Sequence, residues 1–288
     1  MAFRKRREAL RSILSGSSCI RPGSVYDAIS IRIAEDLGFE LGMFGGSVAS
    51  LAVLGDPDVA LITLTELAEQ MRRMSRAATL PVLVDADHGY GNALNVRRTV
   101  QELEAAGAAG LTIEDTLLPQ AFGQSKAQLI SLEEGVGKMK AALDGRSDPS
   151  LVIMARTGAA SISGLDDAIA RARAYDTTGV DALFFTGLKN RAELEAVATA
   201  TKLQIVLGGF PEEMIDLSYL RDQRVPIALQ GHAPFAAATQ AVYETLKALR
   251  EGQPPNHLRG LASPELTGRV TRDADVKARS AEFLGFKR

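Results

Sequence analysis

Eight short β-rich runs recur along the chain, and a stretch with helical spacing of its apolar residues follows each of them. Most of the runs are near-continuously apolar rather than alternating, which is typical of parallel strands buried on both faces. Eight such units predict an α/β fold of the TIM type, a (β/α)8 barrel. The runs lie at residues 18–25, 40–46, 80–87, 110–116, 151–157, 181–187, 204–209 and 225–231.

The alternative to a barrel is an open, doubly wound sheet. No Gly-x-Gly-x-x-Gly sequence follows the first run, which disfavours a dinucleotide-binding fold of that kind. We therefore predict a barrel with an N-terminal helix over residues 1–250. Residues 251–288 fall outside the repeat, because a proline-broken linker leads into short polar helical stretches. This C-terminal helical extension either caps the same barrel or reaches a neighbouring subunit.

Residues that commonly begin or end helices mark several helix boundaries. Gly38 and Gly107 are expected C-terminal caps, and Thr63 or Thr65 is an expected N-terminal cap. The helix before Gly107 is expected to begin after Asn95. The helix that follows the seventh run, within residues 211–222, has the weakest pattern.

Composition narrows the classes of partner and compartment. The 288 residues are 46% hydrophobic, which is ample for a core, and the formal net charge is −2. Such a balance gives no electrostatic reason to expect nucleic acid or an anionic membrane as a partner. The single cysteine, Cys19, excludes an internal disulfide and favours a cytoplasmic location. No apolar run approaches the roughly 20 residues that span a bilayer, and the basic start is expected to form a packed helix rather than a secretory signal.

Polar residues gather where the predicted strands end, which is the end at which barrels of this class carry their active sites. They are Gly45-Gly46-Ser47, Asp85-Ala86-Asp87, Glu114-Asp115, Arg156-Thr157, Gly208-Gly209 and Gln230-Gly231-His232. The common location of these residues on one rim predicts a functional site there.

Three carboxylates on neighbouring strands, Asp85, Asp87 and Glu114, would repel one another unless a cation compensates. Oxygen ligands without a nearby cysteine favour a hard ion, and Mg²⁺ fits best. The structural alternative is that the acids cap helices or pair with arginines, and Asp115 is the best candidate for that role.

The remaining polar residues each have a functional and a structural interpretation. Arg156 could bind a substrate carboxylate with two prongs, form a salt bridge to one of the acids, or do both. The glycine turn before Ser47 could bring backbone N–H groups to an anion. His232 could donate a hydrogen bond to substrate or be structural. The role of His88 is open, and His257 is expected to be exposed to solvent.

The chain resembles the isocitrate lyase / phosphoenolpyruvate mutase superfamily over nearly its whole length. The resemblance rests on segments that occur in family order: RPGSVYDAIS, GGSVAS, GDPDVALIT, DADHGYGN, EAAGAAGLTIEDTLLP, EEGVGKMKAA and IMART. It implies a Mg²⁺-dependent α/β barrel that acts on α-keto acids and related carboxylates by forming or cleaving C–C or P–C bonds. It also implies a homotetramer, a dimer of dimers, with a C-terminal helix exchanged between partners.

The loop after the fourth strand separates the branches of this superfamily. The lyases carry Lys-Lys-Cys-Gly there, with the cysteine as general acid, whereas this chain has LLPQAFGQS, with Phe122 and Gln124. The segments HGYGNALNV, TLLPQAFG and QGHAPF resemble the oxaloacetate decarboxylase branch most. That resemblance implies Ser47, Asp85, Arg156 and His232 as substrate and metal positions. The segment IMARTGAA departs from the usual Arg-Thr-Asp/Asn, which leaves the pocket beyond Arg156 open.

The function expected from this resemblance is Mg²⁺-dependent decarboxylation of oxaloacetate to pyruvate and CO₂ through a metal-stabilised enolate. Asp85 would hold the metal directly, and Asp87 and Glu114 would hold it through water. Arg156 and Ser47 would fix carboxylate oxygens, and His232 would orient the substrate. The alternatives are a lyase or hydrolase of the same superfamily acting on a substituted malate or on phosphonopyruvate, or a keto-acid-binding protein without turnover.

Overall fold

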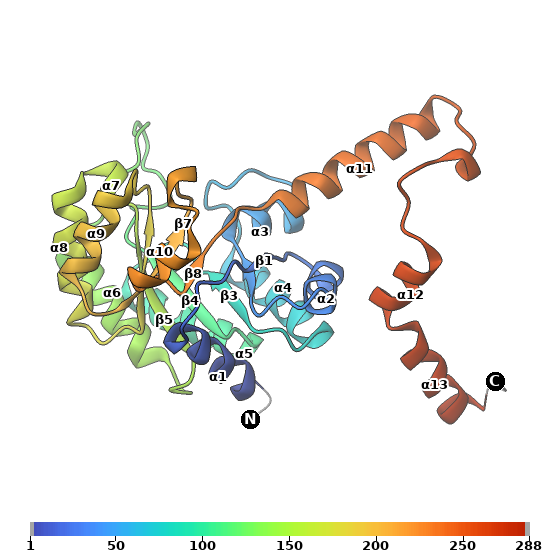
Figure 1. Ribbon diagram of the computed structural model, residues 1–288, viewed down its shortest axis with the longest axis horizontal. Helices are drawn as coiled ribbons and strands as arrows, with labels where there is room; N and C mark the ends of the chain where they lie inside the picture. Colours follow the sequence, from blue (N-terminus) through green and yellow to red (C-terminus); the bar gives the residue numbers. More distant parts are fainter. Residues whose placement is uncertain (1–2, 286–288) are drawn as a thin grey trace.

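Eight parallel strands form one sheet in the order β1 to β8, as the sequence predicts (Figure 1). The computed structural model describes residues 3–285. A parallel bridge between Ile20 and Ile227 brings the segment before β1 alongside β8, at the point where the first and last strands of the barrel meet. The strands are β1 (Gly23–Ser24), β2 (Gly42–Phe44), β3 (Val82–Asp85), β4 (Gly110–Glu114), β5 (Val152–Thr157), β6 (Ala182–Thr186), β7 (Gln204–Gly208) and β8 (Ile227–Ala228).

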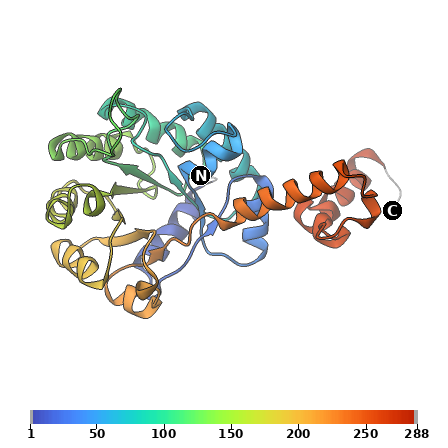
Figure 2. The ribbon, with the colours of Figure 1, turned by 90° about the horizontal axis from the view of Figure 1, so that it is seen from above.

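Helices alternate with the strands and surround them (Figure 2). The α-helices are α1 (Arg4–Ser15), α2 (Ala28–Asp36), α3 (Gly46–Val53), α4 (Leu64–Ala77), α5 (Ala93–Ala106), α6 (Leu132–Gly145), α7 (Ala159–Ile162), α8 (Leu165–Asp176), α9 (Arg191–Ala200), α10 (Leu217–Asp222), α11 (Ala233–Arg250), α12 (Pro264–Thr271) and α13 (Asp273–Leu284). Short 3₁₀ turns, η1 (Glu212–Met214) and η2 (Pro255–His257), precede α10 and α12. The (β/α)8 prediction is confirmed.

The expected capping residues mark the helix boundaries, except at the start of α5. Thr63 caps α4 through a reciprocal pair of hydrogen bonds with Glu66, and Gly107 ends α5 in the left-handed region. The expected start of α5 after Asn95 is wrong, because Asn92 is the cap and Asn95 bonds back to it from the third helical position. The sequence patterns also missed the short helices α3 and α7.

Two apolar layers explain why the strands are near-continuously apolar. Along β5, Val152 and Met154 point into the barrel, while Ile153 and Ala155 pack against the surrounding helices. The next inward position after Met154 on β5 is Arg156. Alternation therefore places a polar side chain inside the barrel at the end of the strand where the active site was expected.

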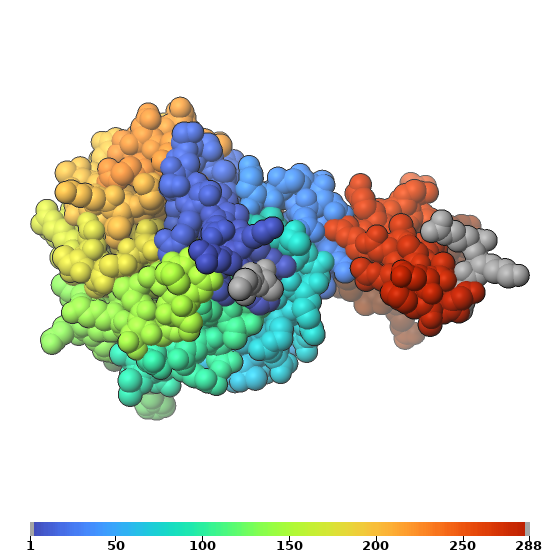
Figure 3. Space-filling model, turned by 90° about the horizontal axis from the view of Figure 1, so that it is seen from below, coloured from blue at the N-terminus to red at the C-terminus, as the bar shows by residue number. Residues whose placement is uncertain are grey.

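Helix α1 lies across the opposite end of the barrel, and Figure 3 shows it in dark blue on the face seen from below. Leu10 and Leu14 join the inner apolar cluster, and Gly110 leaves room for Leu10, because a Cβ there would lie 2.7 Å from Leu10 Cδ2. The buried Arg7 donates to the carbonyl oxygens of Ala108 and Glu104. The expectation of a packed N-terminal helix is confirmed for the described residues.

The last helices leave the barrel. Helix α11 extends away from the ring of helices and has no buried residue (Figures 1 and 2). Beyond it, α12 returns to α2, where Arg272 pairs with Asp36 and Val270 is buried. Across residues 3–285, no helix combines the length and hydropathy that crossing a bilayer requires.

Candidate active site

A pocket of about 220 Å³ opens at the carboxyl ends of the strands. It brings together four of the residues that the sequence singled out, Ser47, Asp85, Arg156 and His232. Its other walls come from Pro22, Met43, Gly45, Asp58, Phe184, Thr186, Gly208, Gly209, Leu229, Gln230 and Gly231. Asp87 and Glu114 do not line this pocket but lie beside the residues that do.

Arg156 joins two of the acids. Its Nη1 lies 2.5 Å from Asp85 Oδ2, and its Nη2 lies 3.0 Å from Glu114 Oε2. Burial alone lowers the pKa of the Arg156 guanidinium, but Asp85 and Glu114 outweigh that effect and its pKa is raised. The Nε–H of Arg156 is buried without a protein partner, so one donor remains for a substrate or water oxygen.

Asp85 is held on both carboxylate oxygens. Thr112 Oγ1 donates to Oδ1 at 3.1 Å, and the backbone N–H of Asp87 donates to the same atom at 3.2 Å. The backbone N–H of Gly46 lies 3.5 Å from Oδ2, the atom that also faces Arg156. These contacts fix the carboxylate at the floor of the pocket before any ligand binds.

Asp87 sits in a tight loop with a left-handed backbone, φ 46°. Gly46 makes room for its side chain, because a Cβ on Gly46 would lie 2.4 Å from Asp87 Oδ1. Burial raises the pKa of Asp87 well above its ordinary value, and the negative charges of Asp85, Asp58 and Glu114 raise it further. Burial also raises the pKa of Glu114, although Arg156 acts in the opposite direction.

The charge balance of this cluster indicates a cation site. Asp58, Asp85, Asp87 and Glu114 share the guanidinium of Arg156 as their neighbouring cation. Burial raises the pKa values of Asp58, Asp87 and Glu114, and the negative charges of their neighbours raise them further. In the described part of the chain, no three His, Cys, Asp or Glu side chains are arranged to hold a metal directly. One direct carboxylate with the other acids acting through water fits Mg²⁺, which retains several waters in protein sites.

Ser47 lies in the first turn of α3, which begins at Gly46 directly after β2. A helix start presents backbone N–H groups without partners within the helix, and these favour an anion. Ser47 adds a hydroxyl at the same place, on the wall of the pocket. The Gly-Gly-Ser turn therefore offers donors to a substrate carboxylate.

His232 occupies the position before the first residue of α11, without a capping bond from its side chain, and it lines the pocket together with Asp58 and Asp85. Its Nδ1 lies 2.7 Å from Ser24 Oγ at the end of β1. Burial lowers the pKa of His232, although Asp85 and Asp58 act in the opposite direction. The ring is therefore neutral near pH 7 and carries one N–H.

The other ionisable residues considered in the sequence lie apart from the pocket. Asp115 is buried and bonds to Arg171 at 2.9 Å and to Tyr175 Oη at 2.8 Å, which is the structural role expected for it. Burial lowers the pKa of His88 to about 4, and its backbone oxygen accepts from Lys138. His257 is exposed, as expected.

Sequence reasoning missed three residues of the site, Asp58, Thr112 and Ser24. Asp58 lies in the loop between α3 and α4, within the segment GDPDVALIT, and its membership of that family segment was the only signal for the pocket. Thr112 lies on β4 two residues before Glu114, and the period of a strand puts both side chains inside the barrel. Ser24 had no comparable signal, because its partner His232 is 208 positions away.

Comparison with known proteins places these features in a family. Residues 10–250 match the model of the phosphoenolpyruvate phosphomutase family. An oxaloacetate decarboxylase of Bradyrhizobium diazoefficiens is 80% identical over 288 residues, which is 100% of each chain. A phosphonopyruvate hydrolase solved with oxalate and Mg²⁺ is 27% identical with a TM-score of 0.85, covering 97% of this chain and 99% of its own. An oxaloacetate acetylhydrolase solved with 3,3-difluorooxalacetate also has a TM-score of 0.85, with 25% identity over 99% of this chain and 98% of its own.

Proposed function

This chain belongs to the phosphoenolpyruvate phosphomutase family, and from that premise we propose that it decarboxylates oxaloacetate to pyruvate and CO₂. The full-length similarity to a named oxaloacetate decarboxylase supports this activity. The single observation that carries the proposal is the shared pocket, in which Asp85 and Arg156 face Ser47 and His232. The loop after β4 fits the same reading, since it has no cysteine to act as a general acid and Phe122 on it is fully exposed.

Mg²⁺ is the cofactor that the acidic cluster supports. Asp85 would hold it directly, with Asp87 and Glu114 acting through water, and the space that Gly46 leaves beside Asp87 supports this arrangement. When bound, Mg²⁺ would act as a Lewis acid that draws electrons from the keto group and stabilises the developing enolate charge. Arg156 neutralises part of the acidic cluster and orients Asp85.

The chain's own residues bind and orient the substrate. Ser47 and the start of α3 donate to carboxylate oxygens, and the free Nε–H of Arg156 and the ring of His232 each add a donor. The C3–C4 bond breaks with loss of CO₂, and its electron pair enters the enolate of pyruvate, which is then protonated at C3. These donors stabilise the enolate as its charge develops, so the step needs no nucleophile from the protein.

The test measures pyruvate release from oxaloacetate with the purified chain, with and without a chelator, against a Mg²⁺-only background. We expect turnover that the chelator abolishes, and we expect Asp85→Asn to lower kcat/KM by at least about 100-fold, because it removes the charge that would hold the metal. Asp144→Asn is the matched control, since Asp144 is an exposed acid paired with Arg97, and it should leave turnover unchanged.

Two results would count against the proposal in different ways. Chelator-resistant turnover, or full activity of Asp85→Asn, would remove the metal assignment. Turnover of phosphonopyruvate or a substituted malate in place of oxaloacetate would change the substrate and keep the metal site.

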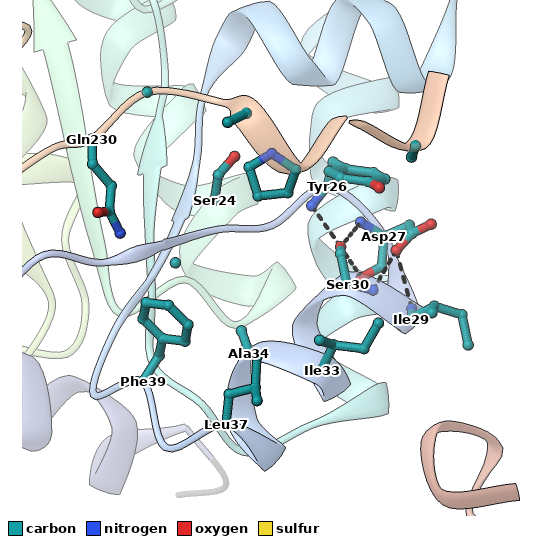
Figure 4. A pocket seen from close by; sticks show the side chains of 15 residues that line it. Ser24, Tyr26, Asp27, Ile29, Ser30, Ile33, Ala34, Leu37, Phe39 and Gln230 are labelled. Carbon is teal, nitrogen blue, oxygen red and sulfur yellow. Dashed lines mark hydrogen bonds between the residues drawn. The ribbon is translucent and has the colours of Figure 1, made fainter. Parts of the chain in front are cut away.

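The exposed helix α11 supports a second copy of this chain as a binding partner. In a (β/α)8 barrel the helix after each strand packs on the barrel, yet α11 extends away after β8 and has no buried residue. Beside β1 and α2 lies an apolar groove of about 460 Å³, with Ile29 and Ile33 on its α2 side (Figure 4). The exposed apolar side chains of α11 include Val242, Tyr243, Leu246 and Leu249.

We propose that α11 of a second copy fills this groove, so that the extension after residue 250 is shared between two barrels in a dimer of dimers. Exposed apolar surfaces of this kind mark contacts between proteins. We retain the division into a barrel at 1–250 and an extension at 251–288 as a proposal, in which α11, at the end of the first part, is the helix that leads into the exchange. The single cysteine, Cys19, continues to support a cytoplasmic location.

A further inference from the structure

We propose that Ser24 is a positioning residue that holds His232 as the Nε2–H tautomer, so that its N–H points at the anionic substrate. The proposal rests on the function above, because it assigns His232 the role of a donor in that reaction. Ser24 does not line the pocket that holds Asp85 and Arg156; it lines the neighbouring apolar groove, and its hydroxyl contacts that pocket through His232.

The geometry fixes both edges of the imidazole ring. Ser24 Oγ lies 2.7 Å from Nδ1, and the serine is buried, with 8% of its surface exposed. On the other edge, a Cβ on Gly45 would lie 2.7 Å from both Cε1 and Nε2. Because Gly45 lines the pocket, the Nε2 edge faces the space where substrate binds.

Counting hydrogens decides which nitrogen carries the proton. His232 Nδ1 is the hydrogen-bond partner of Ser24 Oγ, and this hydroxyl makes no other hydrogen bond within residues 3–285. If the serine donates to Nδ1, the ring keeps its hydrogen on Nε2, and both groups are satisfied. If the ring donated instead, the hydrogen of this nearly buried hydroxyl would have no hydrogen-bond partner within residues 3–285, which is unfavourable.

The surroundings of Nε2 favour the same tautomer. Asp85 and Asp58 carry negative charge near the ring, and a dicarboxylate substrate adds more. An N–H directed into that field is stabilised, whereas a nitrogen lone pair would be repelled. The hydroxyl of Ser24 thus has the orienting role that partners behind an active-site histidine commonly have.

The experiment reads the tautomer directly by NMR on the full chain labelled with ¹⁵N-histidine. The chain has only three histidines, so the His232 signals are assigned by their loss in His232→Gln. We expect an Nε2–H tautomer in the wild type, loss of that preference in Ser24→Ala, and its retention in Ser24→Thr. In parallel, Ser24→Ala should lower kcat/KM for oxaloacetate by roughly 3- to 10-fold, chiefly through KM, and Ser24→Thr should restore it.

Ser150→Ala is the matched control, because Ser150 is equally buried and bonds to Asp148 at the opposite end of the barrel. It should change neither the tautomer nor kcat/KM. An Nδ1–H tautomer in the wild type, or an unchanged tautomer and kcat/KM in Ser24→Ala, would overturn the proposal. If Ser24→Ala fails to fold, Ser24→Cys gives the same comparison with a weaker donor. Since the NMR measurement needs no turnover, failure of the oxaloacetate assignment would appear separately.

Discussion

At the scale of single residues, the candidate active site is a cluster of carboxylates whose positions are fixed by Arg156 and by uncharged neighbours. Asp85 is fixed by Thr112 and by two backbone N–H groups, while Arg156 holds it against Glu114. Asp87 keeps its position because Gly46 has no side chain. Thr112 and Gly46 thus help to fix the positions of Asp85 and Asp87, and these carboxylates form the proposed cation site.

Gly46→Ala tests this dependence at one atom. The added Cβ would lie 2.4 Å from Asp87 Oδ1, so Asp87 must move, and we expect the concentration of Mg²⁺ for half-maximal activity to rise at least about tenfold. A Mg²⁺ titration of turnover measures the change. Gly268→Ala on α12 is the control, since its Cβ would meet nothing closer than 3.8 Å. An unchanged Mg²⁺ requirement in Gly46→Ala would show that Asp87 does not take part in holding the ion.

At the scale of elements, close packing between helices keeps the barrel wall rigid around the strands. Helices α6 and α8 approach closely where Gly135 faces Tyr175, whose hydroxyl donates to the buried Asp115. Asp115 follows Glu114 at the end of β4, so this contact lies directly behind the acidic cluster. Adjacent residues at the end of β4 therefore belong to the helix packing (Asp115) and to the acidic cluster (Glu114).

Two glycines in α6 allow a matched measurement of this packing. A Cβ on Gly135 would lie 2.3 Å from Tyr175 Oη, whereas a Cβ on Gly137 would meet nothing within 4 Å. We expect Gly135→Ala to lower the free energy of unfolding by about 2 kcal/mol through overpacking. Gly137→Ala should raise it by up to about 1 kcal/mol, because alanine restricts the unfolded chain and favours the helix. Urea unfolding measures both, and equal effects of the two changes would contradict the contact.

At the scale of the whole molecule, the barrel buries its apolar side chains, whereas helix α11 exposes them. The barrel has an inner and an outer apolar cluster, whereas α11 exposes its apolar side chains along its length. An exposed apolar helix next to an apolar groove of the same chain supports the exchange between two copies that we propose. His232 is the residue before α11, so the proposed exchange would connect the subunit contact to the candidate active site.

Leu246→Asp tests the exchange. Leu246 is 61% exposed in the single chain, and a carboxylate there would be buried in the partner's groove. We expect the variant to elute as a smaller species than the wild type in size-exclusion chromatography with light scattering. Ala237→Asp introduces the same charge nine residues earlier, on the opposite side of the helix, and should keep the wild-type assembly. A wild type that is itself monomeric would contradict the exchange.

The sequence by itself determined the repeating α/β pattern, all eight strands and the strand ends at which Asp85, Glu114 and Arg156 stand. Those features follow from local periodicity and from the rule that parallel strands end at one face of a barrel. Asn92 as the start of α5 was missed because two asparagines three residues apart both suit a helix start, and only the backbone selects between them.

Tertiary structure alone decided the contacts between distant segments. It brought Ser24 to His232, placed Asp58 in the pocket, and showed that Arg156 joins two acids at once. It also showed that α11 extends away from the barrel, although its sequence is that of an ordinary barrel helix. These features depend on contacts between segments that are far apart in the sequence, and the local periodicity of apolar residues does not encode such contacts.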